Sequence, residues 1–504
     1  MLQPLFFFNF GICNLVSLRP FLNEVSSVMK PAKILIFIIL IISALASICL
    51  FFPKGGISIG KAHLHFPSLD DVFLKQEQAK VEIKEIDSVE LKQLNDLKDT
   101  LQQYRAILTE GQGHFYLPND DVTYFDNIFQ QMEQAKRNQE IIRVLHYGDS
   151  QIEMDRISGN LRTFFQQKFG GGGPGLVPVI QTIPSFAVSQ YASGALVLHA
   201  SYGDGARANG NYGLMAKCYY LDGSAVFGAN ASIHRDVDAR VKRFSNVTLL
   251  YNDRLGNFSA TLQDRKHPFS STCTSTSAGI HHCHFTLDSG STTSLQLTMQ
   301  GNADIYGVML DNGYGVAVDN IPLRGSSGNQ FSMITDTLLR ACYQQANVGM
   351  IILQFGGNTV PALHGDKSID NYCKSIEKQI RYLKRCYPNV TLLFIGPSDM
   401  STRVGGQLQT YPLLPKMIEQ LRATVLRNHV AYWDIYEVMG GENAMVAWVQ
   451  NGLAGPDYVH FTPAGARKVG KCLSNSFSAM YDFYLTRQKI TPQQFDTLWH
   501  VSSK

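Results

Sequence analysis

Several apolar runs of this chain end at turns that carry chemically useful residues, and this arrangement constrains the fold more than any other feature. The run from Ile141 to Tyr147 stops at Gly148-Asp149-Ser150, and helical periodicity follows from Asp155 to Phe169. Open α/β sheets contain such strand–turn–helix junctions and expose reactive groups outside the carboxyl ends of their strands. The sequence therefore predicts an α/β fold with a site at one edge of its sheet.

Ser150 is the candidate nucleophile at this junction. Its backbone N–H would be free at a helix N-terminus, where a developing negative charge is stabilised. A serine hydroxyl attacks poorly unless a neighbouring base takes its proton. Gly-Asp-Ser alone fits an ordinary helix cap equally well, so the interpretation depends on a base elsewhere in the chain.

A base with a nearby carboxylate stands close to the C-terminus. Asp457 precedes His460 by three positions, and a helical run from Ala464 to Phe477 follows them. At this spacing the carboxylate can hold the imidazole in one tautomer while the other ring nitrogen faces a nucleophile. The pair supplies the base that Ser150 requires.

Two further strand ends offer groups that can stabilise an oxyanion. The apolar run 351–355 leads into Gly356-Gly357-Asn358, and the run 316–321 leads to Gly325. The Asn358 amide can donate a hydrogen bond to an oxyanion, a contribution of about 3 kcal/mol or more. Gly325 permits close approach of the backbone and offers a further N–H. These groups complete the set that acyl transfer needs.

In this order, Gly-Asp-Ser, Gly, Gly-x-Asn and Asp-x-x-His resemble the four blocks of the SGNH (GDSL) hydrolase superfamily. The resemblance covers residues 140–184 and 315–480. Each block is weak alone, whereas the ordered set is specific. Two positions depart from the family pattern: Thr359 stands where aspartate usually follows the asparagine, and Gln151 stands where leucine is common. Thr359 in place of aspartate changes a residue that would support the Asn358 amide, but it does not change the role of that amide as a hydrogen-bond donor.

The resemblance implies a three-layer α/β sandwich around a parallel five-stranded sheet. It also implies that Ser150 is the nucleophile, that His460 is the base and that Asp457 orients His460. The backbone N–H groups of Ser150 and Gly325 and the side-chain amide of Asn358 would form the oxyanion hole. The resemblance implies no cofactor and no metal.

Residues 185–314 separate the first two blocks, where a plain α/β fold needs only a crossover helix. Short alternating runs such as Asn246–Tyr251 and Ile305–Leu310, with turn residues between them, predict an inserted β-sandwich. We interpret it as a jelly roll that resembles a carbohydrate-binding module, a layout similar to that of the SGNH peptidoglycan O-acetylesterases of Gram-negative bacteria. Four of its tyrosines are candidates either for stacking on sugar rings or for burial in its core: Tyr202, Tyr212, Tyr219 and Tyr220.

An apolar run from Ile34 to Phe52 lies near the N-terminus, directly after Lys30 and Lys33. Its length suits one transmembrane helix. It also fits a signal peptide, with small residues for cleavage at Ala44-Leu45-Ala46. We favour an uncleaved anchor that leaves the large domain outside. Met29 is a plausible start, with residues 1–28 as an extension.

A charged helical segment follows, and its apolar residues Leu94, Leu97, Leu101, Tyr104 and Leu108 recur at heptad-like spacing. This pattern fits either a coiled-coil stalk between two chains or a spacer helix packed on the catalytic domain. We favour the spacer helix, because two heptads are fewer than a coiled coil requires. The predicted order is an N-terminal extension with a membrane segment (1–57), a helical spacer (58–139), a hydrolase domain (140–184 and 315–485), the inserted sandwich (185–314) and a C-terminal tail (486–504).

Composition excludes other classes of protein. Lys and Arg number 44 against 41 Asp and Glu, and a net charge of +3 is too small to indicate a nucleic-acid partner. The sequence His281-His282-Cys283-His284, with Cys273 nearby, suggests a metal site. Neighbouring residues of a strand face opposite ways, however, so they cannot converge on one ion. A Cys273–Cys283 disulfide across a hairpin is the better interpretation outside the cell.

These features predict a serine esterase that removes O-acetyl groups from a cell-envelope glycan, with peptidoglycan as the preferred candidate. An O-acetyltransferase would use the same triad with a sugar hydroxyl in place of water, and a glycan-binding protein with an inert triad is a third hypothesis. The predicted partners are an acetylated polysaccharide and, through the apolar segment, the membrane. The predicted location is the bacterial periplasm, with the catalytic domain anchored at the inner membrane or released by cleavage.

Overall fold

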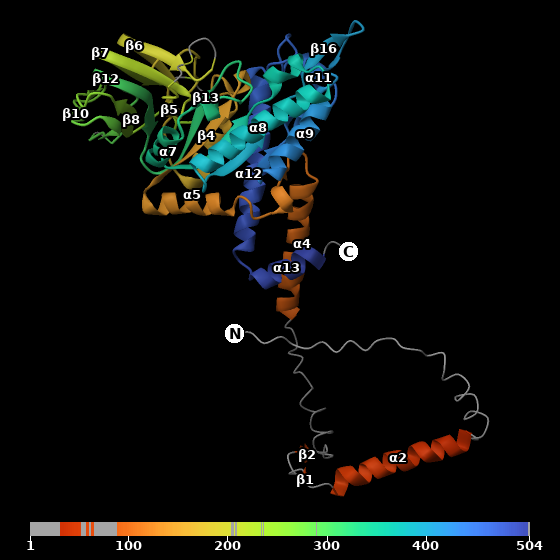
Figure 1. Ribbon diagram of the computed structural model, residues 1–504. Helices are drawn as coiled ribbons and strands as arrows, with labels where there is room; N and C mark the ends of the chain where they lie inside the picture. The colour runs from red at the N-terminus through yellow and green to blue at the C-terminus, as the bar shows by residue number, and fades with distance from the viewer. Residues whose placement is uncertain are drawn as a thin grey trace. The chain divides into compact units, whose positions relative to one another are not determined.

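The computed structural model describes residues 31–51, 57–59, 62–64, 88–202, 206, 209–232, 234, 236–288 and 290–501 (Figure 1). The chain divides into two compact units, Met1–Asn95 and Asp96–Lys504.

In the first unit, helix α2 (Pro31–Phe51) covers most of the predicted apolar run, and the hairpin of β1 (Ile57–Ile59) and β2 (Ala62–Leu64) follows it. A membrane span requires about 20 predominantly apolar residues. Large apolar side chains continue without interruption only from Ile34 to Ile42, after which small and hydroxyl residues intervene. In the described part of the chain, no helix combines the length and hydropathy that crossing a bilayer requires. The prediction of an N-terminal transmembrane helix is therefore wrong.

The second unit is built around a six-stranded sheet. Its strands, in spatial order, are β13 (Gly315–Pro322), β4 (Ile141–Gly148), β14 (Val348–Gln354), β15 (Thr391–Ile395), β18 (Ala431–Trp433) and β3 (Phe115–Tyr116). The first five are parallel, and β3 pairs antiparallel with β18. Five strands were predicted. The sixth is the short edge strand β3, which comes from the segment before the first block. The parallel strands are rich in Val, Ile and Leu because both faces of the sheet are covered.

Alternate residues of the central strands face two separate cores. On β4, Val144 contributes to one core and Leu145 to the other. Helices whose apolar residues share the core of Leu145 are α7 (Asp336–Gln345), α8 (Asp366–Cys386) and α9 (Leu414–Arg427). Helices that share the core of Val144 include α5 (Asp126–Asn138), α6 (Ser158–Phe169) and α12 (Pro463–Arg487). The unit is therefore a three-layer α/β sandwich, as Figure 1 shows.

Shorter elements complete this sandwich. They are η1 (Pro118–Asp120), η2 (Ser150–Ile152), η3 (Phe331–Met333), η4 (Gly357–Ala362), β16 (Ser401–Val404), β17 (Gln407–Thr410), α10 (Ile435–Met439), α11 (Ala444–Gln450) and α13 (Pro492–Val501). Helix α4 (Ser88–Thr109) runs from the charged segment into this unit, where Leu101 and Leu108 are buried in the core of Val144. Arg105 on α4 also donates to the carbonyl of Trp499 at 3.1 Å. Packing of this segment on the catalytic body, and not a free stalk, accounts for its apolar spacing.

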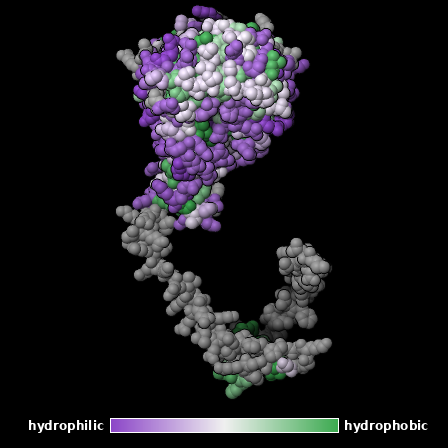
Figure 2. All heavy atoms as spheres, turned by 90° about the vertical axis from the view of Figure 1, so that its left-hand side faces the viewer, coloured by the Kyte–Doolittle hydropathy of each residue, from purple (hydrophilic) through white to green (hydrophobic). Residues whose placement is uncertain are grey.

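The insert is a β-rich lobe with its own core. Its strands are β5 (Gly175–Val177), β6 (Val188–Ala200), β7 (Lys217–Ala231), β8 (Asn246–Asp253), β9 (Ser259–Asp264), β10 (Ser270–Thr274), β11 (Gly279–Thr286) and β12 (Ser294–Asp311). They form one branched sheet, because the first half of β12 pairs with β9 and the second half with β8 and β5. Within the pairing of β12 with β8, the register shifts between Ile305 and Gly307. Hydrophilic and neutral residues predominate on the face of this lobe in Figure 2.

A buried arginine joins the insert to the central sheet. Arg143 on β4 donates to Asp319 on β13 at 3.1 Å and also bonds Asp311 at the end of β12. All three side chains are buried, and Asp319 additionally accepts a hydrogen bond from the Leu176 N–H at 2.7 Å. One guanidinium therefore neutralises two buried carboxylates.

Replacing Arg143 with methionine should cost about 3–5 kcal/mol of unfolding free energy, because two buried carboxylates would lose their partner. Urea unfolding followed by circular dichroism measures this loss. Arg137→Met is the matched control, because Arg137 is 63% exposed in its pair with Glu133, and it should change stability by less than about 1 kcal/mol. Equal losses in the two variants would show that the buried pairing does not stabilise the joint.

Candidate active site

The turn that follows β4 places Ser150 at the carboxyl edge of the sheet. Asp149 caps η2, its side chain accepting a hydrogen bond from the Gln151 N–H at 2.9 Å. The turn is tied to both neighbouring strands, because the Asp149 N–H donates to the Gln354 carbonyl at 3.2 Å and the Leu323 N–H donates to the Gly148 carbonyl at 2.7 Å. The backbone around Ser150 is thus fixed by the ends of β14 and β13.

His460 lies between Ser150 and Asp457. The Ser150 Oγ is 2.8 Å from His460 Nε2, and His460 Nδ1 is 2.8 Å from Asp457 Oδ2. The other carboxylate oxygen of Asp457 accepts from the backbone N–H groups of Val459 and His460, each at 3.1 Å. This geometry allows proton transfer from the serine hydroxyl to the imidazole while the carboxylate orients the ring.

The surroundings of Asp457 keep it ionised. Its partial burial acts to raise the pKa, but the hydrogen bonds from the His460 ring and from the N–H groups of His460 and Val459 outweigh that effect and hold the pKa of Asp457 below its usual range. An ionised Asp457 accepts a hydrogen bond from His460 Nδ1. The lone pair of Nε2 then faces the Ser150 hydroxyl, as a general base requires.

A cavity of about 190 Å³ opens beside Ser150 and His460. Asn358 lines it, and so do several apolar or aromatic residues: Phe355, Pro361, Pro397, Met400, Tyr411 and Val459. The Asn358 amide nitrogen donates one hydrogen bond to the Ser326 carbonyl at 3.0 Å, which leaves its second hydrogen for a ligand. The cavity is small and combines apolar walls with a few polar groups, as a site for a short acyl group requires.

Gly325 is the one of the three predicted oxyanion donors that does not line the cavity. It adopts a left-handed conformation with φ +78°, and no atom lies within 4 Å of where a Cβ would stand. The neighbouring Ser326 accepts the hydrogen bond from Asn358, so the two predicted donors come from adjoining loops. Gly325 itself is absent from the residues that line the cavity of Ser150. The structure therefore brings together Ser150, Asp457, His460 and Asn358, with Gly325 at the margin.

Gln151 connects the two loops that carry Ser150 and His460. Its side-chain nitrogen donates to the Val459 carbonyl at 2.7 Å, and its oxygen accepts from the Phe461 N–H at 3.3 Å. The residue is buried. In the sequence, Gln151 is distinguished only by its departure from the common leucine. The structure shows that an amide at this position bonds the backbone on both sides of His460.

Two charged residues that no motif marked also hold these loops. Arg156 donates to the carbonyls of Ser150 at 2.7 Å, Phe461 at 2.8 Å and Glu153 at 2.9 Å. Arg324, which precedes Gly325, forms a two-pronged ion pair with Glu153 at 2.5 and 2.7 Å. The turn after β4 is thus bonded to both the histidine loop and the Gly325 loop. The only available signal was their closeness in sequence to Ser150 and Gly325.

Asp149 is a buried carboxyl beside the triad. Burial is the main cause that raises its pKa to about 6, whereas the hydrogen bond from Gln151 N–H and the charge of His460 act to lower it. In the unfolded chain the pKa of an aspartate is about 3.9. The folded protein therefore binds a proton more tightly at this position, and its stability should fall as the pH rises from about 4 to 6.

Asp149→Asn should remove the loss of stability that ionisation of the buried carboxyl causes. Asparagine can still accept the hydrogen bond from the Gln151 N–H, but it carries no charge. We expect the variant to gain about 2 to 3 kcal/mol of unfolding free energy over the wild type at pH 7 and almost nothing at pH 3.5. Urea unfolding at a series of pH values measures the difference. A difference that does not vary with pH would mean that Asp149 does not titrate with a raised pKa.

The remaining candidates of the insert have structural roles. A disulfide links Cys273 on β10 with Cys283 on β11. In the part of the chain that the structure describes, no group of His, Cys, Asp and Glu is arranged to hold a metal ion. Tyr212 and Tyr219 are fully buried, so they cannot stack on a sugar from solvent. Tyr220 is partly buried, with the Arg254 guanidinium 4.5 Å from its ring centre.

The structure has a parallel sheet with Ser150 after one strand and an Asp-x-x-His loop before the last long helix of the sandwich, which is the arrangement that the resemblance to the SGNH hydrolases predicts. No family model matches the sequence, and a search of curated proteins gives no match. The structure is similar to one described as a peptidoglycan O-acetylesterase in action, with a TM-score of 0.58 and 20% identity over 71% of this chain and 96% of that chain. The resemblance to the SGNH hydrolases is thereby confirmed at the level of the fold.

Other solved structures match with lower scores. A family two carbohydrate esterase from Cellvibrio japonicus gives a TM-score of 0.24 and 11% identity over 59% of this chain and 99% of that chain. An acetyl xylan esterase gives a TM-score of 0.26 and 14% identity over 32% of this chain and 81% of that chain. Scores this low do not establish a common fold, so the likeness rests on the first structure.

Proposed function

We propose that the protein is a serine esterase that removes O-acetyl groups from a cell-envelope glycan, with peptidoglycan as its substrate. The observation that carries this proposal is the continuous hydrogen-bonded series Ser150–His460–Asp457, with distances of 2.8 Å at both steps, at the wall of a cavity that also holds Asn358. The fold shared with a peptidoglycan O-acetylesterase supports the choice of substrate.

The reaction proceeds in two stages. The Ser150 Oγ attacks the acetyl carbonyl carbon while His460 Nε2 takes the hydroxyl proton, and negative charge develops on the carbonyl oxygen. The Asn358 amide and the Ser150 N–H, which both line the cavity, stabilise that oxyanion, and the Gly325 N–H at the margin is the third predicted donor. When the carbon–oxygen bond to the sugar breaks, His460 returns its proton to the sugar oxygen. Water then attacks the acetyl-enzyme with His460 again as base, and acetate leaves.

We place the protein in the bacterial periplasm. An acetylated peptidoglycan is accessible there, and the Cys273–Cys283 disulfide of the insert is compatible with an oxidising compartment. Fractionation of cells that express the full chain, followed by trapping of free thiols, tests the location. A protein found in the cytoplasmic fraction with Cys273 and Cys283 reduced would contradict it.

The full chain should release acetate from O-acetylated peptidoglycan and from p-nitrophenyl acetate. Peptidoglycan whose acetyl groups were removed by mild base is the matched negative substrate. Measurement of free acetate and of acetyl groups retained on the glycan separates hydrolysis from transfer, because a transferase would move acetyl groups to an added sugar acceptor without freeing acetate. A protein that binds the glycan but consumes no acetyl ester would show that the triad is inert.

A further inference from the structure

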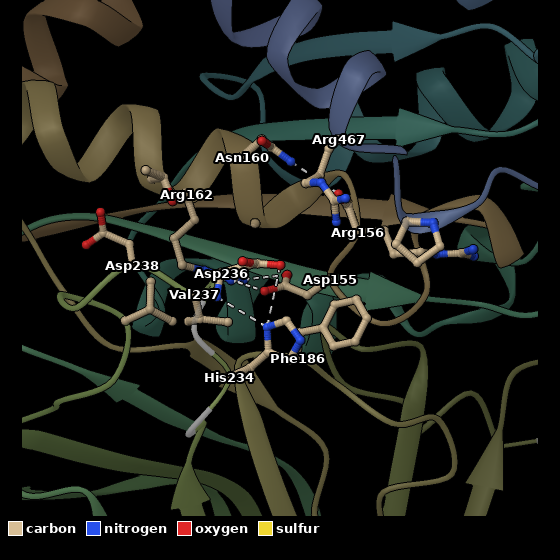
Figure 3. A pocket seen from close by; sticks show the side chains of 14 residues that line it. Asp155, Arg156, Asn160, Arg162, Phe186, His234, Asp236, Val237, Asp238 and Arg467 are labelled. Carbon is tan, nitrogen blue, oxygen red and sulfur yellow. Dashed lines mark hydrogen bonds and ion pairs between the residues drawn. The ribbon is translucent and has the colours of Figure 1, made fainter. Parts of the chain in front are cut away.

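A second cavity lies between the hydrolase and the insert. It has a volume of about 230 Å³. Asn160 on α6 and Pro463 and Arg467 on α12 form its hydrolase wall, and Phe186 and His234 belong to the insert (Figure 3). The cavity is separate from the one beside Asn358, and the chemistry of the triad does not use it.

One wall of this second cavity is aromatic. The rings of Phe186 and His234 stack with their centres 5.3 Å apart and their planes at 29°. Phe186 is partly exposed and His234 is exposed. Flat rings that remain accessible in a cavity offer an apolar surface to a flat ligand, such as the C–H face of a sugar ring.

The rest of the lining carries three arginines, Arg156, Arg162 and Arg467, and three aspartates. Asp155 is paired with Arg162, and Asp238 lies 3.4 Å from Arg240. Asp236, near His234, is the other carboxylate of the lining. Among the described residues, Arg467 forms no ion pair or hydrogen bond, and its side chain is exposed. An exposed guanidinium that has no ion pair or hydrogen bond is suited to bind a carboxylate with two parallel hydrogen bonds.

The second cavity also shares structural elements with the triad. Arg156 lines it and donates to the carbonyls of Ser150 and Phe461. Pro463 and Arg467 belong to the first two turns of α12, the helix that begins directly after the loop of His460. A polymer whose ester lies at Ser150 can therefore continue past this loop into the second cavity.

We propose that the second cavity is a subsite for a neighbouring sugar unit that carries a carboxylate. The carboxylate binds Arg467, and the sugar ring packs on Phe186. Glycan strands of peptidoglycan that have lost their peptides contain such a unit, because the lactyl group on every second sugar then ends in a free carboxylate. The inference rests on the proposed function for its substrate, but binding of the acidic sugar can be measured without turnover.

The binding test uses the full chain and glycan strands of peptidoglycan from which peptides and acetyl groups have been removed, with chitotetraose as a neutral probe. Arg467→Ala should weaken binding of the acidic strand about 10-fold and leave binding of chitotetraose unchanged, as measured by calorimetry. Phe186→Ala should weaken both. Lys471→Ala is the matched control, because it removes an exposed positive charge from α12 outside the cavity. Its binding should equal that of the wild type.

Equal binding of the acidic strand by Arg467→Ala and wild type would overturn the subsite, and equal weakening of both probes would overturn the role of the carboxylate. With acetylated glycan strands from which only the peptides have been removed, Arg467→Ala should also lower kcat/KM relative to that for p-nitrophenyl acetate by about 10-fold. Absence of acetate release from the wild type would contradict the proposed function alone, because the binding results stand independently. Thermal unfolding of each variant excludes a loss of fold as the cause.

Discussion

Replacement of Ser150 by alanine should reduce acetate release from acetylated peptidoglycan by at least about 10⁴-fold, because the hydroxyl oxygen forms the bond to the acetyl carbon. Release from p-nitrophenyl acetate should fall as well, since both esters require the same attack. Steady-state acetate release, corrected for uncatalysed hydrolysis, measures the effect. Retention of wild-type turnover would show that Ser150 is not the nucleophile.

The fold of this variant should not change. Ser150 is partly buried, and its hydroxyl bonds only His460 among the described residues, so its removal leaves no deeply buried group without a partner. Ser189→Ala, at an exposed position of β6, is the matched control and should keep full activity. A Ser150→Ala variant that unfolds several degrees below this control would lose activity for a structural reason, and trapping the wild-type acetyl-enzyme would then identify the nucleophile.

The meeting of Ser150, Asn358 and His460 could be predicted because each follows an element whose position in a parallel sheet is restricted. Ser150 and Asn358 stand after β4 and β14, which are neighbours in the sheet. Carboxyl ends of parallel strands share one edge, so residues far apart in sequence must meet there. The Asp-x-x-His spacing predicted the contact between the Asp457 carboxylate and the His460 ring, because the two residues are only three positions apart.

Other features had no periodic signal. Strand β3 contains only two residues, and its pairing with β18 depends on how the preceding segment packs. The hydrogen bonds of Arg156 and Gln151 go to backbone carbonyls or N–H groups of a distant loop, which no side-chain pattern specifies. The change of partners along β12, from β9 to β8, likewise has no periodic signal in the sequence. The apolar run near the N-terminus suggested a membrane span by its length, but in the described part of the chain no helix combines the length and hydropathy that a span requires.

His460→Ala should lower acetate release nearly as much as Ser150→Ala does. Without the imidazole, no base lies within hydrogen-bonding distance of the Ser150 hydroxyl among the described residues, and no group returns a proton to the leaving sugar oxygen. Asp457→Asn should be comparable or milder, because it alters only the tautomer and orientation of the ring. His282→Ala, at an exposed position of β11, is the matched control and should retain wild-type turnover.

The double variant Ser150→Ala/His460→Ala distinguishes cooperation from independent contributions. If His460 acts only through the Ser150 hydroxyl and its acetyl ester, then removing it from a protein that already lacks the hydroxyl should cost almost nothing more. The double variant should therefore match the slower single variant within about threefold, as residual acetate release measures. Losses that multiply would mean that each residue acts separately, and the 2.8 Å contact between Ser150 Oγ and His460 Nε2 would then have no catalytic consequence.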